Sequence, residues 1–274
     1  MKNYVQILMG PSRMLPGILT LLLLSIPMFG QQRLLVIGGG ERPPEAMKRF
    51  AAWSGGERGR VLVITWASSV PDESFLSLKR ELTSAGAGQA EHAPPAPLDD
   101  AGRARFVSQM GSATGVFFSG GDQNRIMDVL ADKELLDLLR KSYAAGIPFG
   151  GTSAGAAVMS DPMMTGDADL KLLDGKKVGV RRGLGLVPNV IFDQHFLVRQ
   201  RHNRLFGLVI ENPKMLGIGI DEDTAVLIEN NTRMQVVGKT QVMMVNPRKN
   251  GEMVVAFLSA NEHYDLKRRR RLSR

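Results

Sequence analysis

The chain has 274 residues, of which 43% are hydrophobic and 23% charged, as in an ordinary globular protein. Its formal charge of +8 lies at the two ends, because residues 267–274 supply six positive charges and the first thirty residues supply two, with no acid in either segment. Residues 31–266 thus carry no net charge, which excludes a basic nucleic-acid-binding body, and the absence of cysteine excludes disulfides, thiolate metal ligands and a cysteine nucleophile.

The N-terminal segment has the pattern of a secretory signal peptide. Lys2 and Arg13 precede an apolar run over residues 15–29, and the small residue Gly30 follows. Prolines interrupt the run, which is too short for a membrane span of about 20 residues. We therefore expect removal of residues 1–30 and export to the periplasm or the extracellular space, without stable membrane association. An uncleaved anchor remains the alternative, because the bulky Met28 lies close to the expected cleavage point.

From residue 33 to residue 149, buried-strand runs alternate with helical patterns. Short apolar runs predict strands at Arg33–Ile37, Arg60–Thr65 and Gly115–Phe118. Helical patterns cover Pro43–Trp53, Asp72–Ala85, Gln123–Leu130 and Lys133–Ala145. The proline-rich segment Glu91–Leu98 is predicted as a loop. Continuous apolar strands separated by helices indicate a mostly parallel sheet that is covered on both faces.

Beyond residue 189 the strand candidates become short and closely spaced. A strand at Asn189–Phe192 and a helix at Arg199–Ile210 come first. Five further strand candidates follow at Leu216–Ile220, Ala225–Glu229, Met234–Val237, Gln241–Val245 and Met253–Leu258. Their spacing predicts antiparallel additions to one edge of the sheet. We take residues 31–266 as one domain, and the basic residues 267–274 as a disordered tail.

Three glycine-rich turns follow predicted strands, at the end of an open α/β sheet where ligands bind. The first, residues 38–40, lacks the third glycine of a dinucleotide-binding turn, which favours close packing against the other turns. The turn at residues 150–155 contains Gly151-Thr-Ser153-Ala-Gly155, which matches the G-x-S-x-G nucleophile elbow. Small neighbours let such a serine project from a sharp strand-to-helix turn. On this pattern alone, a tightly packed turn without chemistry remains equally open.

A serine nucleophile needs a base and an acid, and both are available at later strand ends. Of the four histidines, His195 directly follows the strand at Asn189–Phe192, so we expect it near Ser153. The other three lie in the proline-rich loop, on an arginine-rich helix and near the C-terminus. The strand at 216–220 is followed by three acids, Asp221, Glu222 and Asp223. The order serine, histidine, acid differs from that of the α/β-hydrolases, so another fold is expected.

Four segments in this order resemble motifs of the cyanophycinases, serine exopeptidases of the family that also holds aspartyl dipeptidase (peptidase E). They are residues 117–123 (FFSGGDQ), 150–156 (GGTSAGA), 188–196 (PNVIFDQHF) and 219–225 (GIDEDTA). The resemblance extends from about Arg33 to Leu258. It implies a three-layer α/β sandwich with a mostly parallel central sheet, the fold shared with class I glutamine amidotransferases.

The resemblance also implies roles for individual residues. Ser153 would be the nucleophile, His195 its base and Glu222 the third member of the triad. The N–H groups of Gly121 and Ala154 would form the oxyanion hole. The residues expected to line the site and bind substrate are Asp122, Gln123, Asp193, Gln194, Arg199, Arg201 and Arg204.

The implied substrate is cyanophycin, a poly-aspartate chain with an arginine joined to each side-chain carboxyl. The family cuts its backbone into β-Asp-Arg dipeptides through an acyl-enzyme. The free carboxylates of this polymer need cationic partners, which the three arginines after His195 offer. We expect neither a metal nor an organic cofactor, a peptide and not a nucleic acid as partner, and a homodimer.

Three alternatives remain at this point. A peptidase of the same family that acts on short aspartyl or isoaspartyl peptides differs by no visible motif. An unrelated esterase would need an acid between Ser153 and His195, where the aspartates lie just after the serine helix and not at a strand end. A secreted binding protein without activity is disfavoured by the intact serine, histidine and glutamate.

Overall fold

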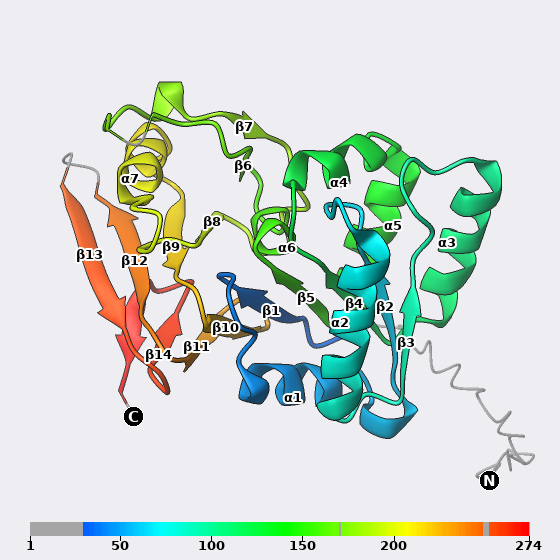
Figure 1. Ribbon diagram of the computed structural model, residues 1–274. Helices are drawn as coiled ribbons and strands as arrows, with labels where there is room; N and C mark the ends of the chain where they lie inside the picture. The colour runs from blue at the N-terminus through cyan, green and yellow to red at the C-terminus, as the bar shows by residue number, and fades with distance from the viewer. Residues whose placement is uncertain (1–29, 170, 249–251, 274) are drawn as a thin grey trace, which may run out of the picture.

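The computed structural model of the chain describes residues 30–169, 171–248 and 252–273 (Figure 1). The predicted signal peptide lies outside the described residues except for Gly30, and it stays a prediction. In the part of the chain that is described, no helix has the length and apolar character needed to cross a bilayer.

A nine-stranded sheet forms the centre of the molecule, in the order β15-β14-β11-β10-β1-β5-β4-β2-β3. Five strands run parallel: β1 (Arg33–Ile37), β5 (Phe149–Thr152), β4 (Gly115–Phe118), β2 (Arg60–Ile64) and β3 (Gln89–His92). Antiparallel strands extend the sheet on the other side of β1: β10 (Thr224–Glu229), β11 (Arg233–Gly238), β14 (His263–Asp265) and β15 (Arg270–Leu272).

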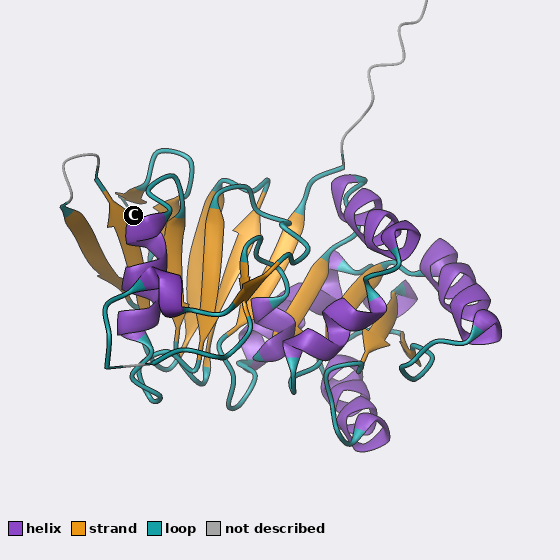
Figure 2. Cartoon of the chain, turned by 90° about the horizontal axis from the view of Figure 1, so that it is seen from above, coloured by secondary structure: helices purple, strands orange, loops and turns teal. Residues whose placement is uncertain are grey.

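Helices cover both faces of the parallel strands (Figure 2). Leu35 and Ile37 of β1 pack with Phe50 on the face covered by α1 (Pro44–Trp53) and α2 (Pro71–Ser84). Leu34 and Val36 face the opposite core. The elements on that side are α3 (Asp100–Ser112), α4 (Gln123–Val129), α5 (Lys133–Ala144) and the short α6 (Ala154–Ala157). The predicted three-layer α/β sandwich is confirmed.

A second sheet of four strands departs from the prediction. Its order is β13-β12-β9-β8, with bounds β8 (Val190–Gln194), β9 (Leu216–Ile220), β12 (Val242–Pro247) and β13 (Met253–Leu258). Of the five late strand candidates, therefore, only β10 and β11 extend the large sheet. In β9, Gly217 and Gly219 leave space for Leu205 and Phe196 to pack directly on the strand. Leu205 belongs to α7 (His202–Glu211), which gives this sheet its own helical cover.

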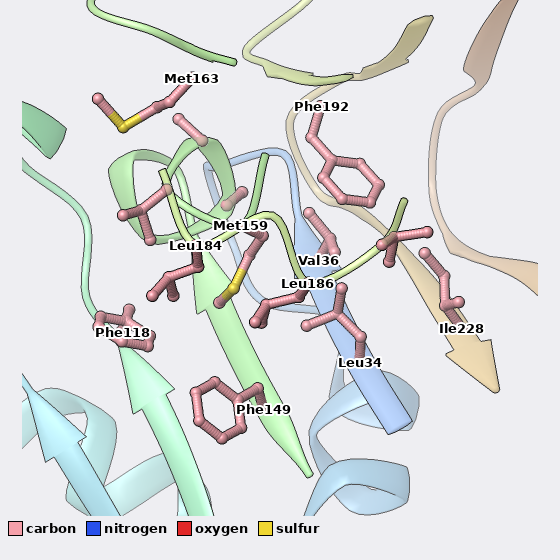
Figure 3. Packing of buried hydrophobic residues seen from close by; sticks show 14 of the residues in the cluster. Leu34, Val36, Phe118, Phe149, Met159, Met163, Leu184, Leu186, Phe192 and Ile228 are labelled. Carbon is pink, nitrogen blue, oxygen red and sulfur yellow. The ribbon is translucent and has the colours of Figure 1, made fainter. Parts of the chain in front are cut away.

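The largest core joins the two sheets (Figure 3). Phe118 and Phe149 come from the large sheet, and Phe192 comes from β8. Met159 and Leu186, from the segment between α6 and β8, fill the space between them. This segment contains the small hairpin of β6 (Met163–Met164) and β7 (Val180–Arg181) and the 3₁₀ turn Gly175–Lys177; another 3₁₀ turn is Gly56–Arg58.

The sequence pattern did not reveal α3 and β3. Helix α3 has a capping residue, Asp99, whose carboxylate accepts a hydrogen bond from the Gly102 N–H at 2.7 Å. Only Phe106 and Met110 of this helix are buried, so its apolar stripe is too sparse for a periodicity argument. In β3, which overlaps the predicted loop, only Ala90 is buried.

The prediction of a disordered C-terminal tail is wrong for residues 267–273. Residues 270–272 form β15, which pairs with β14. The arginines of this hairpin have partners on neighbouring segments: Arg271 lies 3.1 Å from a carboxylate oxygen of Glu262, just before β14, and Arg269 donates to Asn246 Oδ1 of β12 at 2.9 Å. These contacts order a run of positive charges that would repel one another in isolation.

Candidate active site

The four predicted motifs meet where the two sheets adjoin. β1, β4 and β5 end here side by side, and β8 of the second sheet ends beside them (Figure 1). The chain leaves the second sheet at Ile220 and enters the large sheet at Thr224. Residues 221–223 therefore cross between the sheets above the end of β1, which puts the three predicted acids at the junction.

Ser153 occupies a strained turn between β5 and α6. Its φ of 53° and ψ of −113° are costly for any residue other than glycine. Its N–H donates to the Ile37 carbonyl at 3.1 Å. A Cβ on Gly151 would overlap the Gly155 carbonyl, and a Cβ on Gly155 would overlap the carbonyl of Phe118. The small residues of the motif are thus required by direct backbone contacts around the serine.

His195 follows β8 and connects the serine to an acid. Its Nε2 lies 2.8 Å from Ser153 Oγ, and its Nδ1 lies 2.5 Å from Glu222 Oε1. The backbone is held by a hydrogen bond from the His195 N–H to the Gly38 carbonyl at 2.7 Å. Because Nδ1 faces a carboxylate, the network assigns the proton of a neutral ring to Nδ1, which leaves Nε2 free to accept the serine proton.

The pKa of His195 is lowered from its ordinary value of about 6.5, chiefly by burial. The hydrogen bond and charge of Glu222 oppose this shift, whereas the nearby positive charges of Arg199 and Arg201 add to it. The imidazole is therefore neutral near pH 7, the form in which it can act as a base.

Only one of the three acids after β9 reaches the histidine. Glu222 does so, with its side chain 37% exposed. Asp221 is buried and its Oδ1 accepts hydrogen bonds from two N–H groups of the loop after His195, at 3.1 Å each. Asp223 accepts a hydrogen bond from the Glu41 N–H at 2.7 Å. Backbone N–H groups thus hold Asp221 and Asp223 in other hydrogen bonds, which leaves Glu222 as the acid that pairs with His195.

The first glycine turn packs directly against His195 and Glu222. Gly39 has a φ of 120°, and a Cβ at this position would overlap the His195 ring. On Gly40, with a φ of 66°, a Cβ would come within 3.0 Å of Glu222 Cβ. The absence of side chains on this turn therefore lets His195 and Glu222 pack directly on its backbone.

The second glycine turn lies beside Ser153, since a Cβ on Gly120 would come 3.3 Å from Ser153 Cβ. The Asp122 carboxylate caps α4 by accepting from the Asn124 N–H at 2.8 Å. Gln123 is buried and donates to the Met164 carbonyl at 2.8 Å. Both side chains have structural partners, and their contact with substrate stays a prediction. The same holds for the two N–H groups expected to form the oxyanion hole.

The predicted basic cluster is divided by burial. Arg204 and Asp193 are fully buried and pair with each other, one contact being Nε to Oδ2 at 2.9 Å, so neither offers a free charge to a substrate. Arg201 is half-buried and donates to the Gln194 carbonyl at 2.8 Å; burial and the nearby Arg204 lower its pKa to about 10. Arg199 is exposed. Helix α7 begins only at residue 202, because Gln200, with a φ of 51°, interrupts the predicted helix.

A cavity adjoins the serine, and most of the residues that line it lie outside the four motifs. Its lining comes from four separate segments: Arg42, Val70, Glu73, Ser74, Ser77, Leu78, Ser119, Gly120 and Thr152. In the ranges that the structure describes, no group of three or more histidines and acids is arranged to hold a metal ion.

The sequence profile of peptidase family S51 matches residues 34–236. The chain belongs to peptidase family S51. A cyanophycinase of Nostoc sp. is 33% identical over 86% of this chain and 80% of its own length. A cyanophycinase of Geminocystis herdmanii is 34% identical over 78% of this chain and 80% of its own length. The S51 chain is thus a peptidase of the cyanophycinase and peptidase E type.

Solved structures share this S51 fold. A peptidase from an acI-B1 Actinobacterium superposes with a TM-score of 0.67 at 23% identity, covering 86% of this chain and 97% of the other. A putative peptidase E protein from Listeria monocytogenes gives a TM-score of 0.54 at 17% identity, covering 84% of this chain and all of the other. At these identities the likeness concerns the fold alone.

Proposed function

We propose that the protein is a serine exopeptidase that hydrolyses cyanophycin to β-Asp-Arg dipeptides. The observation that carries the proposal is the continuous hydrogen-bonded chain from Ser153 through His195 to Glu222, built on a strained elbow. This arrangement has the nucleophile, base and orienting acid of a serine peptidase. The cyanophycinases among its relatives support the substrate.

Acylation follows from the positions of the three side chains. Ser153 Oγ attacks the aspartyl carbonyl while His195 Nε2 accepts its proton, and Glu222 stabilises the imidazolium through Nδ1–H. The N–H groups of Gly121 and Ala154 would then donate to the developing oxyanion, with the start of α6 adding its dipole. His195 returns the proton to the leaving amine as the peptide C–N bond breaks.

Deacylation reverses these roles. Water attacks the acyl-serine ester while His195 accepts its proton, and the same proton then passes to Ser153 Oγ as the ester bond breaks. The neutral state of His195 suits both steps, because burial holds its pKa low. No step requires a metal ion or an organic cofactor.

Product identity tests the proposed substrate. The purified protein, incubated with insoluble cyanophycin, should release β-Asp-Arg as the soluble product, which mass spectrometry identifies. Poly-aspartate without arginine and α-linked aspartyl dipeptides serve as controls. Hydrolysis of short aspartyl or isoaspartyl peptides without attack on the polymer would replace cyanophycin by the alternative of the same family, and an absence of hydrolysis on all of them would contradict the proposal.

Gly39→Ala should lower kcat/KM by about 100-fold or more, because the new Cβ would overlap the His195 ring and move it away from Ser153. Gly86→Ala is the matched control. Gly86 also has a positive φ, of 99°, but a Cβ there would have nothing within 4 Å. The control should therefore lose stability without a comparable loss of kcat/KM. Equal kcat/KM for the two variants in a peptide hydrolysis assay would contradict this role of Gly39.

A further inference from the structure

The cavity beside Ser153 has a volume of about 280 Å³. Thr152 and Gly120, which lie next to Ser153, are among the residues that line it. In liquid water, about nine molecules occupy this volume, so the cavity has room for one long side chain. A substrate residue next to the scissile bond can therefore place its side chain in this cavity, which residues of α2 also line.

Three of the polar residues that line the cavity come from one face of α2. Glu73, Ser74 and Ser77 line the cavity from this helix. Ser74 Oγ lies 2.7 Å from Ser68 Oγ and keeps a lone pair for a further donor. The wall thus combines a carboxylate with hydroxyl oxygens, which are acceptors for N–H groups.

The charge of the cavity is negative because its cation is already neutralised. Arg42 donates to both carboxylate oxygens of Glu81, with Nε 2.5 Å from Oε2, and also to Ser77 Oγ at 3.3 Å. Within the described ranges, by contrast, no cationic side chain pairs with Glu73, which is exposed at the cavity. One uncompensated carboxylate therefore remains in the cavity that adjoins Ser153.

We propose that this cavity binds the cationic side chain of the substrate, with the Glu73 carboxylate pairing the guanidinium of an arginine. A carboxylate and a guanidinium form two parallel hydrogen bonds, which select this group by shape as well as charge. The site then has opposite charges in two places: Glu73 in the cavity, and the exposed Arg199 on the loop that follows His195. An arginine linked through its amino group carries both a guanidinium and a free carboxylate, the two groups that these opposite charges attract. The proposal rests on the proposed function for the bond that is cut.

Binding to the Ser153→Ala protein tests this assignment without turnover. Calorimetry should give a Kd for β-Asp-Arg that Glu73→Gln raises about tenfold or more, because a charge-assisted hydrogen bond is lost. The analogue with citrulline, which has the same length but no charge, should bind more weakly to the Ser153→Ala protein and be nearly insensitive to Glu73→Gln. Thermal unfolding checks that the exposed substitution leaves the fold intact.

Asp72→Asn is the matched control, because it removes the same charge from the neighbouring residue of the same helix turn, outside the cavity lining. It should leave both Kd values unchanged. Equal effects of Glu73→Gln on the two peptides, equal binding of both to the Ser153→Ala protein, or no binding of either would overturn the proposal. A failure of the proposed function appears in a different assay, as the absence of β-Asp-Arg release by the protein with Ser153 intact.

Discussion

Ser153→Ala should lower kcat for peptide hydrolysis on the order of 10⁶-fold, since removing the nucleophile of a serine–histidine–acid unit abolishes acylation. The substitution takes away only Oγ, which contacts His195 and caps no helix. Peptide binding and the unfolding temperature should therefore stay close to those of the parent protein. Product release measures kcat, and calorimetry of the same sample measures peptide binding and the unfolding temperature.

Ser160→Ala is the control for the loss of a hydroxyl in the same region. Ser160 is fully buried, and its Oγ accepts a hydrogen bond from the Phe192 N–H at 2.8 Å. Its removal leaves a buried donor unpaired and should cost about 1–3 kcal/mol of stability while most of kcat is kept. If Ser153→Ala retained activity within about tenfold of the parent, the nucleophile would have to be another residue.

The parallel half of the fold follows from the sequence because its strands are buried on both faces. β1 and β4 are continuous apolar runs that end in glycine turns, and their bounds agree with the predictions. The second sheet could not be predicted in this way. β9 and β10 are both almost fully buried, so their burial patterns do not distinguish the sheet that each strand joins.

The positions of Ser153 and His195 could be predicted from the sequence because close contacts around them require particular residue types nearby. The elbow requires small residues around Ser153, and His195 and the acids each follow a strand. The selection of Glu222 among three acids depends on backbone N–H groups that no motif encodes. The cavity that contains Glu73 is also invisible in the sequence, because its walls come from segments that meet only in three dimensions.

Glu222→Gln should lower kcat about 10⁴-fold with the fold unchanged. The carboxylate accepts the Nδ1 proton of His195 at 2.5 Å and so keeps Nε2 available for the serine proton. A glutamine amide can donate to Nδ1 instead, which would place the ring proton on Nε2 and prevent it from accepting. The neutral amide also fails to stabilise the imidazolium that forms when Ser153 attacks.

The pH profile separates this role from a merely structural one. Both the hydrogen bond and the charge of Glu222 raise the pKa of His195, so their loss lowers that pKa further, and the acid limb of kcat/KM should move to lower pH. Asp223→Asn is the control, because it removes a neighbouring carboxylate that bonds to the Glu41 N–H and to Lys239 and not to the histidine. It should keep the limb in place and most of kcat. A Glu222→Gln protein with parental kcat, or with the acid limb moved to higher pH, would refute the assignment of Glu222 as the partner of the catalytic base.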